Sequence, residues 1–232
     1  MVEAYCKQFF GYGRWDAPVW FIGLEEAGTG KPAELQIRLA AWDKGGRREL
    51  EDAPEFYPKC GQHQWHGQDA TLQCTWRQLM RIVRLARGET VEESGLLEYQ
   101  QRAFGASTGD LCITELSPLP ARNQGHWPYA AYTDVPAWMK TREQFMQAIA
   151  KGRIATLREK IATHHPRAVV FFISNRRDSS MAKEDMAQRM HEPKIPGEVL
   201  GLDKLTAENH HPYPPPGFLA GQKWNTRETT RS

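Results

Sequence analysis

Short apolar runs separated by longer amphipathic or polar segments set the hydrophobic pattern of this chain. Apolar runs occupy residues 19–22 and 168–173, and a third strand-like run occupies residues 111–114. Near-continuous β-branched and aromatic runs of this length are typical of strands covered on both faces. Amphipathic periodicity predicts helices over residues 75–87 and 142–163. The pattern therefore predicts an α/β fold with a mostly parallel sheet flanked by helices.

The segments around these elements complete the predicted arrangement. The helix over 142–163 should be the crossover of a βαβ unit that leads into the strand at 168–173, and Gly152 should bend or interrupt it. Segments 44–73 and 117–137 are rich in Gly, Pro and polar residues, which predicts loops. In open α/β sheets the binding crevice lies outside the carboxyl ends of the strands. Because polar residues follow the apolar runs, we expect those strand ends to converge on one site.

Length and composition bound the class of protein. A chain of 232 residues fits a single domain over residues 1–232, with a polar tail at 225–232 that is expected to fray. No apolar run approaches the ~18 residues of a membrane span, so no membrane partner is expected. The N-terminus resembles no secretory signal, and the four scattered cysteines suit free thiols, so we expect a cytoplasmic location. A net charge of +2 permits nucleic-acid binding without arguing for it.

Three short polar motifs lie where predicted strands end or near the C-terminus. The first is Gly23-Leu24-Glu25-Glu26-Ala27-Gly28, which alone could be a glycine-flanked turn with two exposed acids. The second is Asn209-His210-His211-Pro212, followed by Tyr213-Pro214-Pro215-Pro216-Gly217-Phe218-Leu219, which alone could begin a loop. The third is Ile113-Thr114-Glu115-Leu116-Ser117-Pro118-Leu119-Pro120-Ala121-Arg122-Asn123, in which Glu115 could simply cap a helix or pair with Arg122.

Together these motifs resemble the signature motifs of the uracil-DNA glycosylase superfamily. The first is similar to GQDPYH or GEAPG after an apolar strand, the second to the family's His-Pro motif, and the third to the pattern ITN followed by Pro-Pro and Asn-Arg. The resemblance implies a monomeric three-layer α/β/α domain that flips a nucleotide out of single- or double-stranded DNA. It also implies hydrolysis of the N-glycosidic bond, which leaves an abasic site, without a cofactor.

The resemblance also assigns roles to residues. Glu25 or Glu26 would hold the attacking water and stabilise the positive charge that develops on the sugar, whereas His211 would stabilise negative charge on the departing base. Phe218 or Leu219 would fill the space left by the flipped base. Base contacts would come from Glu115, Asn123 and Asn175, and DNA contacts from Arg122, Arg176, Arg177 and Pro215.

One departure from the family bears on the base. Glu115 stands where the family has an asparagine that reads uracil, and an ionised glutamate only accepts hydrogen bonds. An acceptor suits the exocyclic amine of cytosine, so we expect a modified cytosine, as in hypermodified phage DNA, and a role in anti-phage defence. One alternative is repair of uracil or another deaminated base, with Glu115 protonated or displaced and Asn123 or Asn175 reading the base. Another is a DNA-binding module without catalytic activity.

Two further features carry weaker expectations. Cys60, His63, His66 and Cys74 have ligand-type side chains, but their spacing fits no standard zinc site, and Cys6 lacks the close partner of an iron–sulfur motif. We therefore expect no metal. The basic stripe of the helix over 75–87 is expected to be a solvated face rather than a DNA surface; its residues are Arg77, Arg81 and Arg84.

Overall fold

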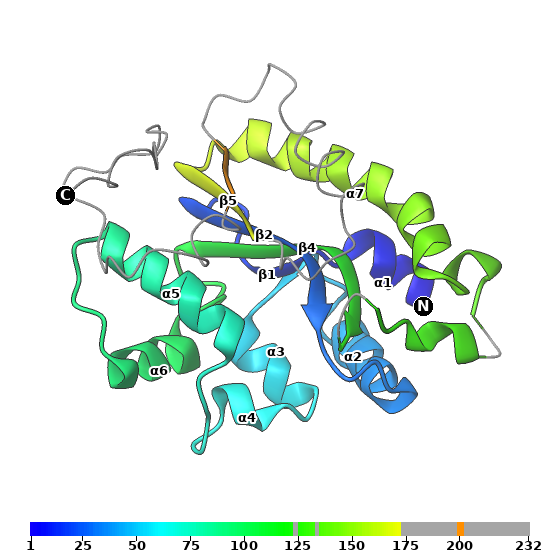
Figure 1. The fold of residues 1–232 in the computed structure, drawn as a ribbon, viewed down its shortest axis with the longest axis horizontal. Helices are drawn as coiled ribbons and strands as arrows, with labels where there is room; N and C mark the ends of the chain where they lie inside the picture. Colours follow the sequence, from blue (N-terminus) through cyan, green and yellow to red (C-terminus); the bar gives the residue numbers. More distant parts are fainter. Residues whose placement is uncertain (123–124, 133–134, 173–198, 202–232) are drawn as a thin grey trace, which may run out of the picture.

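The computed structural model describes residues 1–122, 125–132, 135–172 and 199–201. Within them, a six-stranded sheet has the order β3-β1-β4-β2-β5-β6 (Figure 1). The parallel strands are β2 (Val19–Ala27), β4 (Leu111–Ala121), β5 (Ala168–Phe172) and β6 (Val199–Gly201). At one edge, β1 (Gly11–Gly13) runs antiparallel to β4, and β3 (Leu50–Glu51) runs parallel to β1. The predicted α/β fold with a mostly parallel sheet is confirmed.

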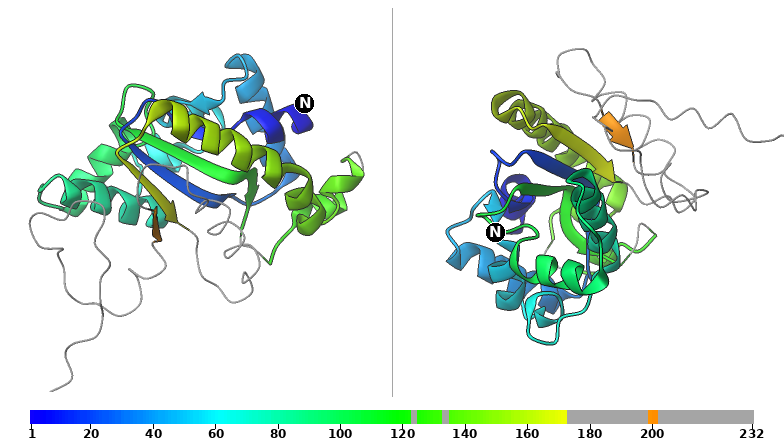
Figure 2. Two further views of the ribbon diagram at one scale, coloured as in Figure 1. Left: turned by 90° about the horizontal axis from the view of Figure 1, so that it is seen from above. Right: turned by 90° about the vertical axis from the view of Figure 1, so that its left-hand side faces the viewer.

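Helices cover both faces of the sheet, as Figure 2 shows. On one face, α7 (Arg142–His164) packs Leu157 and Ile161 against the strands. On the other, α5 (Cys74–Ala86) and α6 (Glu93–Arg102) bury Leu79, Met80 and Leu96 against the sheet. The strands are therefore buried from both sides, which explains why their sequences are continuously apolar rather than alternating.

A third apolar cluster lies beside the β1 edge and joins short helices to the start of α7. It contains residues of α1 (Val2–Gln8), α2 (Pro32–Lys44) and α3 (Ala53–Lys59), which pack with Phe145 and Ile149 of α7. Aromatic side chains dominate it, and Tyr5 stacks on Phe9 with ring centroids 4.7 Å apart. The cluster extends the core beyond the sheet.

Arg153 of α7 fastens this cluster to the central sheet. Its guanidinium is buried and donates hydrogen bonds to the carbonyl oxygens of Cys6 (2.9 Å), Phe9 (2.8 Å) and Glu115 (2.6 Å). It also lies 4.2 Å from the ring centroid of Phe10. Burial lowers the pKa of Arg153 to about 10. A charged side chain buried among carbonyl oxygens is held by several hydrogen bonds at once, so it fixes α1, α7 and β4 relative to one another.

Two predicted strands continue further than their apolar runs. β2 reaches Ala27, so Glu25 and Glu26 belong to the strand and not to a turn after it. β4 reaches Ala121 and includes Pro118 and Pro120, so the loop predicted from residue 117 is wrong at its start. Proline is tolerated because β1 pairs with β4 only near residues 112–114, so no described strand pairs with that side of the later part of β4.

The segment 44–73 is also more ordered than the prediction of a loop. It contains β3, α3 and α4 (His63–His66). Asp52 caps α3 by accepting a hydrogen bond from the backbone N–H of Glu55 (3.1 Å), and it also accepts from Ser107 N (2.7 Å) and Oγ (2.8 Å). Tertiary contacts of this kind are not visible in local composition.

Further along the chain, residues 117–137 include the 3₁₀ helices η1 (Pro128–Ala131) and η2, whose range is Ala137–Met139. The predicted interruption at Gly152 is absent, because α7 runs unbroken through this residue. Gly152 is exposed, and a single glycine is tolerated in an exposed helix interior. The prediction of free thiols is confirmed for all four cysteines.

Candidate functional site

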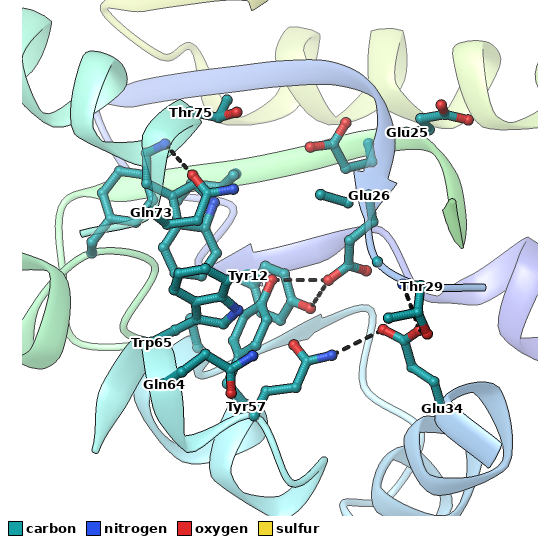
Figure 3. Close-up of a pocket in the computed structure, with 18 of the residues that line it drawn as sticks. Tyr12, Glu25, Glu26, Thr29, Glu34, Tyr57, Gln64, Trp65, Gln73 and Thr75 are labelled. Atoms are coloured by element: carbon teal, nitrogen blue, oxygen red, sulfur yellow. Dashed lines mark hydrogen bonds between the residues drawn. The ribbon is translucent and has the colours of Figure 1, made fainter. Parts of the chain in front are cut away.

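A pocket of about 230 Å³ lies beside the carboxyl ends of β2 and β5 and the first half of β4. Aromatic rings from β1, α3, α4 and α5 and the amides of three glutamines form much of its wall (Figure 3). None of the described residues that line it carries a positive charge, whereas four of them are glutamates: Glu25, Glu26, Glu34 and Glu115. The pocket therefore combines ring-stacking surfaces with a concentration of carboxyl groups.

Glu26 is held by a buried network of three donors. Its Oε1 accepts hydrogen bonds from the hydroxyls of Tyr12 (2.5 Å) and Tyr57 (2.9 Å), and Nη1 of Arg38 lies 2.8 Å away. Figure 3 shows the carboxylate turned toward both phenols. Burial, and after it the charge of Glu26, raises the pKa of both tyrosines well above the ordinary value. Its Oε2 has no hydrogen-bond partner among the described residues, so one oxygen is fixed and the other remains available.

Glu25 points away from Glu26 and pairs with Arg142 at the start of α7 (Figure 3). Nη2 of Arg142 also donates to the carbonyl oxygen of His126 (3.0 Å), and its guanidinium lies 5.0 Å from the ring of Trp127. Successive side chains of a strand point to opposite sides, which explains the divergence of the two glutamates. Sequence reasoning left open which of them acts on water, and the two have different partners in the structure.

Glu115 has no ionic partner among the described residues, and its carboxyl lies against Gly23, the residue paired with it in the neighbouring strand. A Cβ atom on Gly23 would be 2.0 Å from Oε2 of Glu115, so glycine makes room for the carboxyl. That Oε2 is buried without a hydrogen-bond partner within the described ranges. Burial, and after it the charges of Glu26 and Glu25, raises the pKa of Glu115 well above its usual range, although Arg153 opposes the shift.

The raised pKa of Glu115 favours its protonated form over the anion, because burial beside two other carboxyl groups disfavours a negative charge. This differs from the ionised acceptor on which the expectation of a cytosine base rests. A protonated carboxyl carries one O–H donor as well as acceptor capacity. The alternative pairing of Glu115 with Arg122 is not formed, and Arg122 is exposed just after β4.

Glu34, which the sequence analysis did not single out, fixes the loop after β2. Its Oε2 accepts hydrogen bonds from Thr29 N (2.8 Å), Thr29 Oγ1 (2.6 Å) and Gly30 N (3.0 Å), and its Oε1 accepts from Nε2 of Gln62 (3.0 Å). Its position in the first turn of α2 also places a carboxylate at the positive end of a helix dipole. The sequence does contain a signal for this role, because Pro32 followed by Glu34 is typical of the first turn of a helix.

Part of the aromatic wall comes from α3 and α4, within the segment 44–73 that was predicted to be a loop. Tyr57 and Trp76 meet edge to face with centroids 5.1 Å apart, and His66 packs against both at 5.4 and 5.6 Å. Burial lowers the pKa of His66 to about 4, so this imidazole is neutral at pH 7. Nε2 of Gln100 donates to the carbonyl oxygens of Trp65 (2.8 Å) and Thr71 (2.9 Å) and holds the segment in place. These contacts between residues distant in sequence hold the polar segment around Trp65 and Thr71 at the wall of the pocket.

The zinc-type residues are not assembled into a ligand set. Across the described residues, no group of three or more His, Cys, Asp or Glu side chains could hold a metal ion. Cys60 is buried whereas Cys74 is exposed, although both belong to the same short stretch of sequence. The expectation that this stretch binds no metal stays a prediction.

The basic stripe of α5 is largely paired with acids rather than open to a ligand. Arg77 pairs with Glu93 (2.5 Å), and Arg84 pairs with Glu89 (2.8 Å). Such exposed pairs suit the solvated face expected from the sequence. No helix in the described part of the chain is long and apolar enough to cross a membrane.

The structure brings Glu25 and Glu26, near the carboxyl end of β2, to one pocket with Glu115. Because β4 continues to Ala121, Glu115 lies inside the strand and not at its end as predicted. Apart from Arg122, the other predicted site residues lie outside the described residues: Asn123, Asn175, Arg176, Arg177, His211, Pro215, Phe218 and Leu219. No protein-family model, no curated protein and no solved structure matches this chain.

Proposed function

We propose that this protein is a DNA N-glycosylase that binds a flipped base in the pocket and hydrolyses its glycosidic bond. The observation that supports this most is the meeting of carboxyl groups in unlike environments with aromatic side chains, beside the carboxyl end of β2 and the first half of β4. A flipped base stacks between aromatic side chains and is read by hydrogen bonds along its edge. Cleavage of its bond to the sugar needs a nearby carboxylate to orient water and stabilise positive charge.

Glu26 suits the carboxylate role best. Two phenols and Arg38 fix Oε1, while Oε2 has no hydrogen-bond partner among the described residues. A carboxylate held in this way needs little reorganisation as positive charge develops on the sugar. Glu25 forms an ion pair with Arg142. Glu25 is the second candidate for the carboxylate that accepts a proton from water. His211 would stabilise the departing base from the C-terminal motif.

The base is either a modified cytosine or a deaminated base such as uracil. A neutral Glu115 can donate to an acceptor on either kind of base, so its charge state does not favour cytosine as an ionised glutamate would. The experiment therefore includes both kinds of substrate: modified cytosine, which would indicate a role in defence, and deaminated bases, which would indicate a role in repair. A DNA-binding module without activity is the second candidate function, and it predicts binding with no base released.

The experiment incubates the purified protein with single- and double-stranded DNA containing uracil, damaged bases or phage-type modified cytosines. Mass spectrometry then detects released bases and abasic sites. We expect release of at least one base, and a loss of about 10²-fold or more in Glu25→Gln, Glu26→Gln and His211→Ala with DNA binding largely retained.

Glu98→Gln is the matched control, because Glu98 is an exposed glutamate of α6 paired only with Arg102 at 3.1 Å among the described residues. It should keep the wild-type rate. DNA binding without release of any base would instead favour the silent module. Wild-type rates in all three site variants would place the chemistry elsewhere.

A further inference from the structure

The site contains carboxyl groups whose surroundings favour opposite charge states. Glu26 lies 2.8 Å from the Arg38 guanidinium and Glu25 pairs with Arg142, so both are stabilised as anions. Glu115, in contrast, presses one oxygen against the backbone of Gly23, where that oxygen has no partner among the described residues. In carboxyl pairs that share a site, such a contrast separates the group that donates a proton from the group that remains charged.

The side chains around Glu115 are mostly acidic or neutral, so they do not stabilise a negative charge on its carboxyl. Glu25 and Glu26 approach from β2, Tyr12 lines the same pocket from β1, Tyr57 lines it from α3, and Glu34 does so from α2. Among the described residues, the cation that opposes the shift is Arg153 of α7, but its hydrogen bond goes to the backbone carbonyl of Glu115 and not to the carboxyl. Burial next to two anions therefore outweighs this cation and raises the pKa of Glu115.

The buried position of Oε2 leaves Oε1 as the oxygen that Glu115 can offer to the pocket. We propose that Glu115 is a catalytic acid, which donates the proton of its carboxyl through Oε1 to the base as the base leaves. This inference rests on the proposed glycosylase function and adds to it a second source of leaving-group stabilisation. It also replaces the passive base-reading role expected from the sequence.

The step balances as a hydrolysis. The bond between C1′ and the base nitrogen breaks and its electron pair goes to the base, while Glu115 transfers its proton to a carbonyl oxygen or ring nitrogen of that base. The oxygen of water forms the new bond to C1′, and its proton passes to the Glu25 or Glu26 carboxylate. Proton exchange with solvent then returns Glu115 to its acid form and the other carboxylate to its anion.

The first test reads the charge of Glu115 without any substrate. Infrared spectra of the wild type near pH 7 should contain a protonated-carboxyl band that is lost in Glu115→Gln and kept in the control Glu98→Gln. The band should disappear in wild type only as the pH is raised through the elevated pKa of Glu115. A band identical in the wild type and in Glu115→Gln would show that Glu115 is ionised, and this would overturn the proposal.

The second test separates proton donation from simple contact. Uracil or cytosine derivatives in oligonucleotides are compared with their 5-fluoro counterparts, whose bases leave more easily as anions and need less help from an acid. Glu115→Gln keeps the shape and an N–H donor but has no acidic proton. We expect it to slow release of the parent base by about 10²–10⁴-fold and that of the fluorinated base much less. Glu26→Gln should slow both equally.

The pH dependence of the rate tests whether the protonated or the ionised form of Glu115 is active. Because the acid form is the active one, the wild-type rate should fall as pH rises through the pKa of Glu115, and Glu115→Gln should lack this fall. Gly23→Ala is a second variant, since its Cβ would displace the Glu115 carboxyl, the movable end of a side chain, and it should reproduce the same leaving-group dependence.

The outcomes distinguish the two proposals. Wild-type rates and an unchanged pH profile in Glu115→Gln, with the wild type active, would overturn the acid role alone. Equal losses on parent and fluorinated bases would reduce Glu115 to a positioning residue and also overturn it. If no DNA probe loses a base, the glycosylase function fails and the catalytic role fails with it, whereas the infrared band still reports whether Glu115 is neutral.

Discussion

At the scale of single residues, the charge of each glutamate depends on its partners from distant parts of the chain. The sequence predicts that Glu25, Glu26 and Glu115 converge, because strand ends of a parallel sheet meet at one edge. It does not predict that Arg38 fixes Glu26, or that Gly23 leaves room for the Glu115 carboxyl. Those contacts decide protonation, and they depend on the packing of α2 and on the register of β2 with β4.

Removal of the charge of Glu26 should destabilise the fold. Glu26→Gln would leave the guanidinium of Arg38, which is 0% exposed, without its buried counter-ion. We expect a loss of about 3–5 kcal/mol in the free energy of unfolding, as for other buried pairs broken on one side. Urea unfolding measures it, with Glu98→Gln as the exposed control. A change as small as that of the control would show that the pair contributes little.

The pH dependence of stability should report the proton on Glu115. In the unfolded chain this carboxyl titrates near the ordinary pKa of 4.5, whereas the raised pKa in the folded protein keeps the proton bound to higher pH. Above that value the unfolded state binds fewer protons than the folded state, so rising pH favours unfolding until the folded pKa is passed. Glu115→Gln should therefore gain stability relative to wild type as the pH rises above 4.5, as measured by urea unfolding midpoints at a series of pH values. A difference that does not change with pH would contradict this.

At the scale of elements, the apolar core of each strand is predictable but its end is not. The runs at 19–22 and 111–114 identify β2 and β4, yet both strands continue through polar residues or prolines. Local composition marks Pro118 and Pro120 as breakers, but they are acceptable because no described strand pairs with one side of the later part of β4. For the same reason the wall of the pocket at 60–76 is not visible in the sequence, since contacts with α6 order it.

The continuity of α7 at Gly152 leads to a prediction at this scale. A Cβ atom built on Gly152 meets nothing within 4 Å among the described residues. Gly152→Ala should therefore stabilise the protein by about 1 kcal/mol, the cost of glycine in an exposed helix interior. Thermal unfolding measures it. Gly11→Ala is the contrasting variant, because its φ of +149° and a built Cβ 2.0 Å from the carbonyl oxygen of Ile113 should make it destabilising; equal effects in both variants would refute the argument.

At the scale of the whole molecule, the order of the strands places the site. β2 lies between β4 and β5, and all three run in the same direction, so their carboxyl ends share one edge. The alternating strand and helix pattern of the sequence is sufficient to predict that edge. It does not predict the antiparallel β1 or the short β3, because each is too brief to carry a periodic signal and is held in place by pairing with another strand.

The hydrogen bonds of Arg153 also have a consequence for the order in which the protein assembles. Cys6 and Phe9 precede Arg153 by 147 and 144 positions. During synthesis the first helix therefore leaves the ribosome long before the side chain that anchors it, and contacts so distant in sequence form late. The backbone carbonyl of Glu115 also accepts a hydrogen bond from this guanidinium, so that bond too forms only after α7 is synthesised. A nascent chain stalled before α7 would therefore expose the aromatic cluster that Phe145 and Ile149 cover, and its Glu25 would lack the partner Arg142.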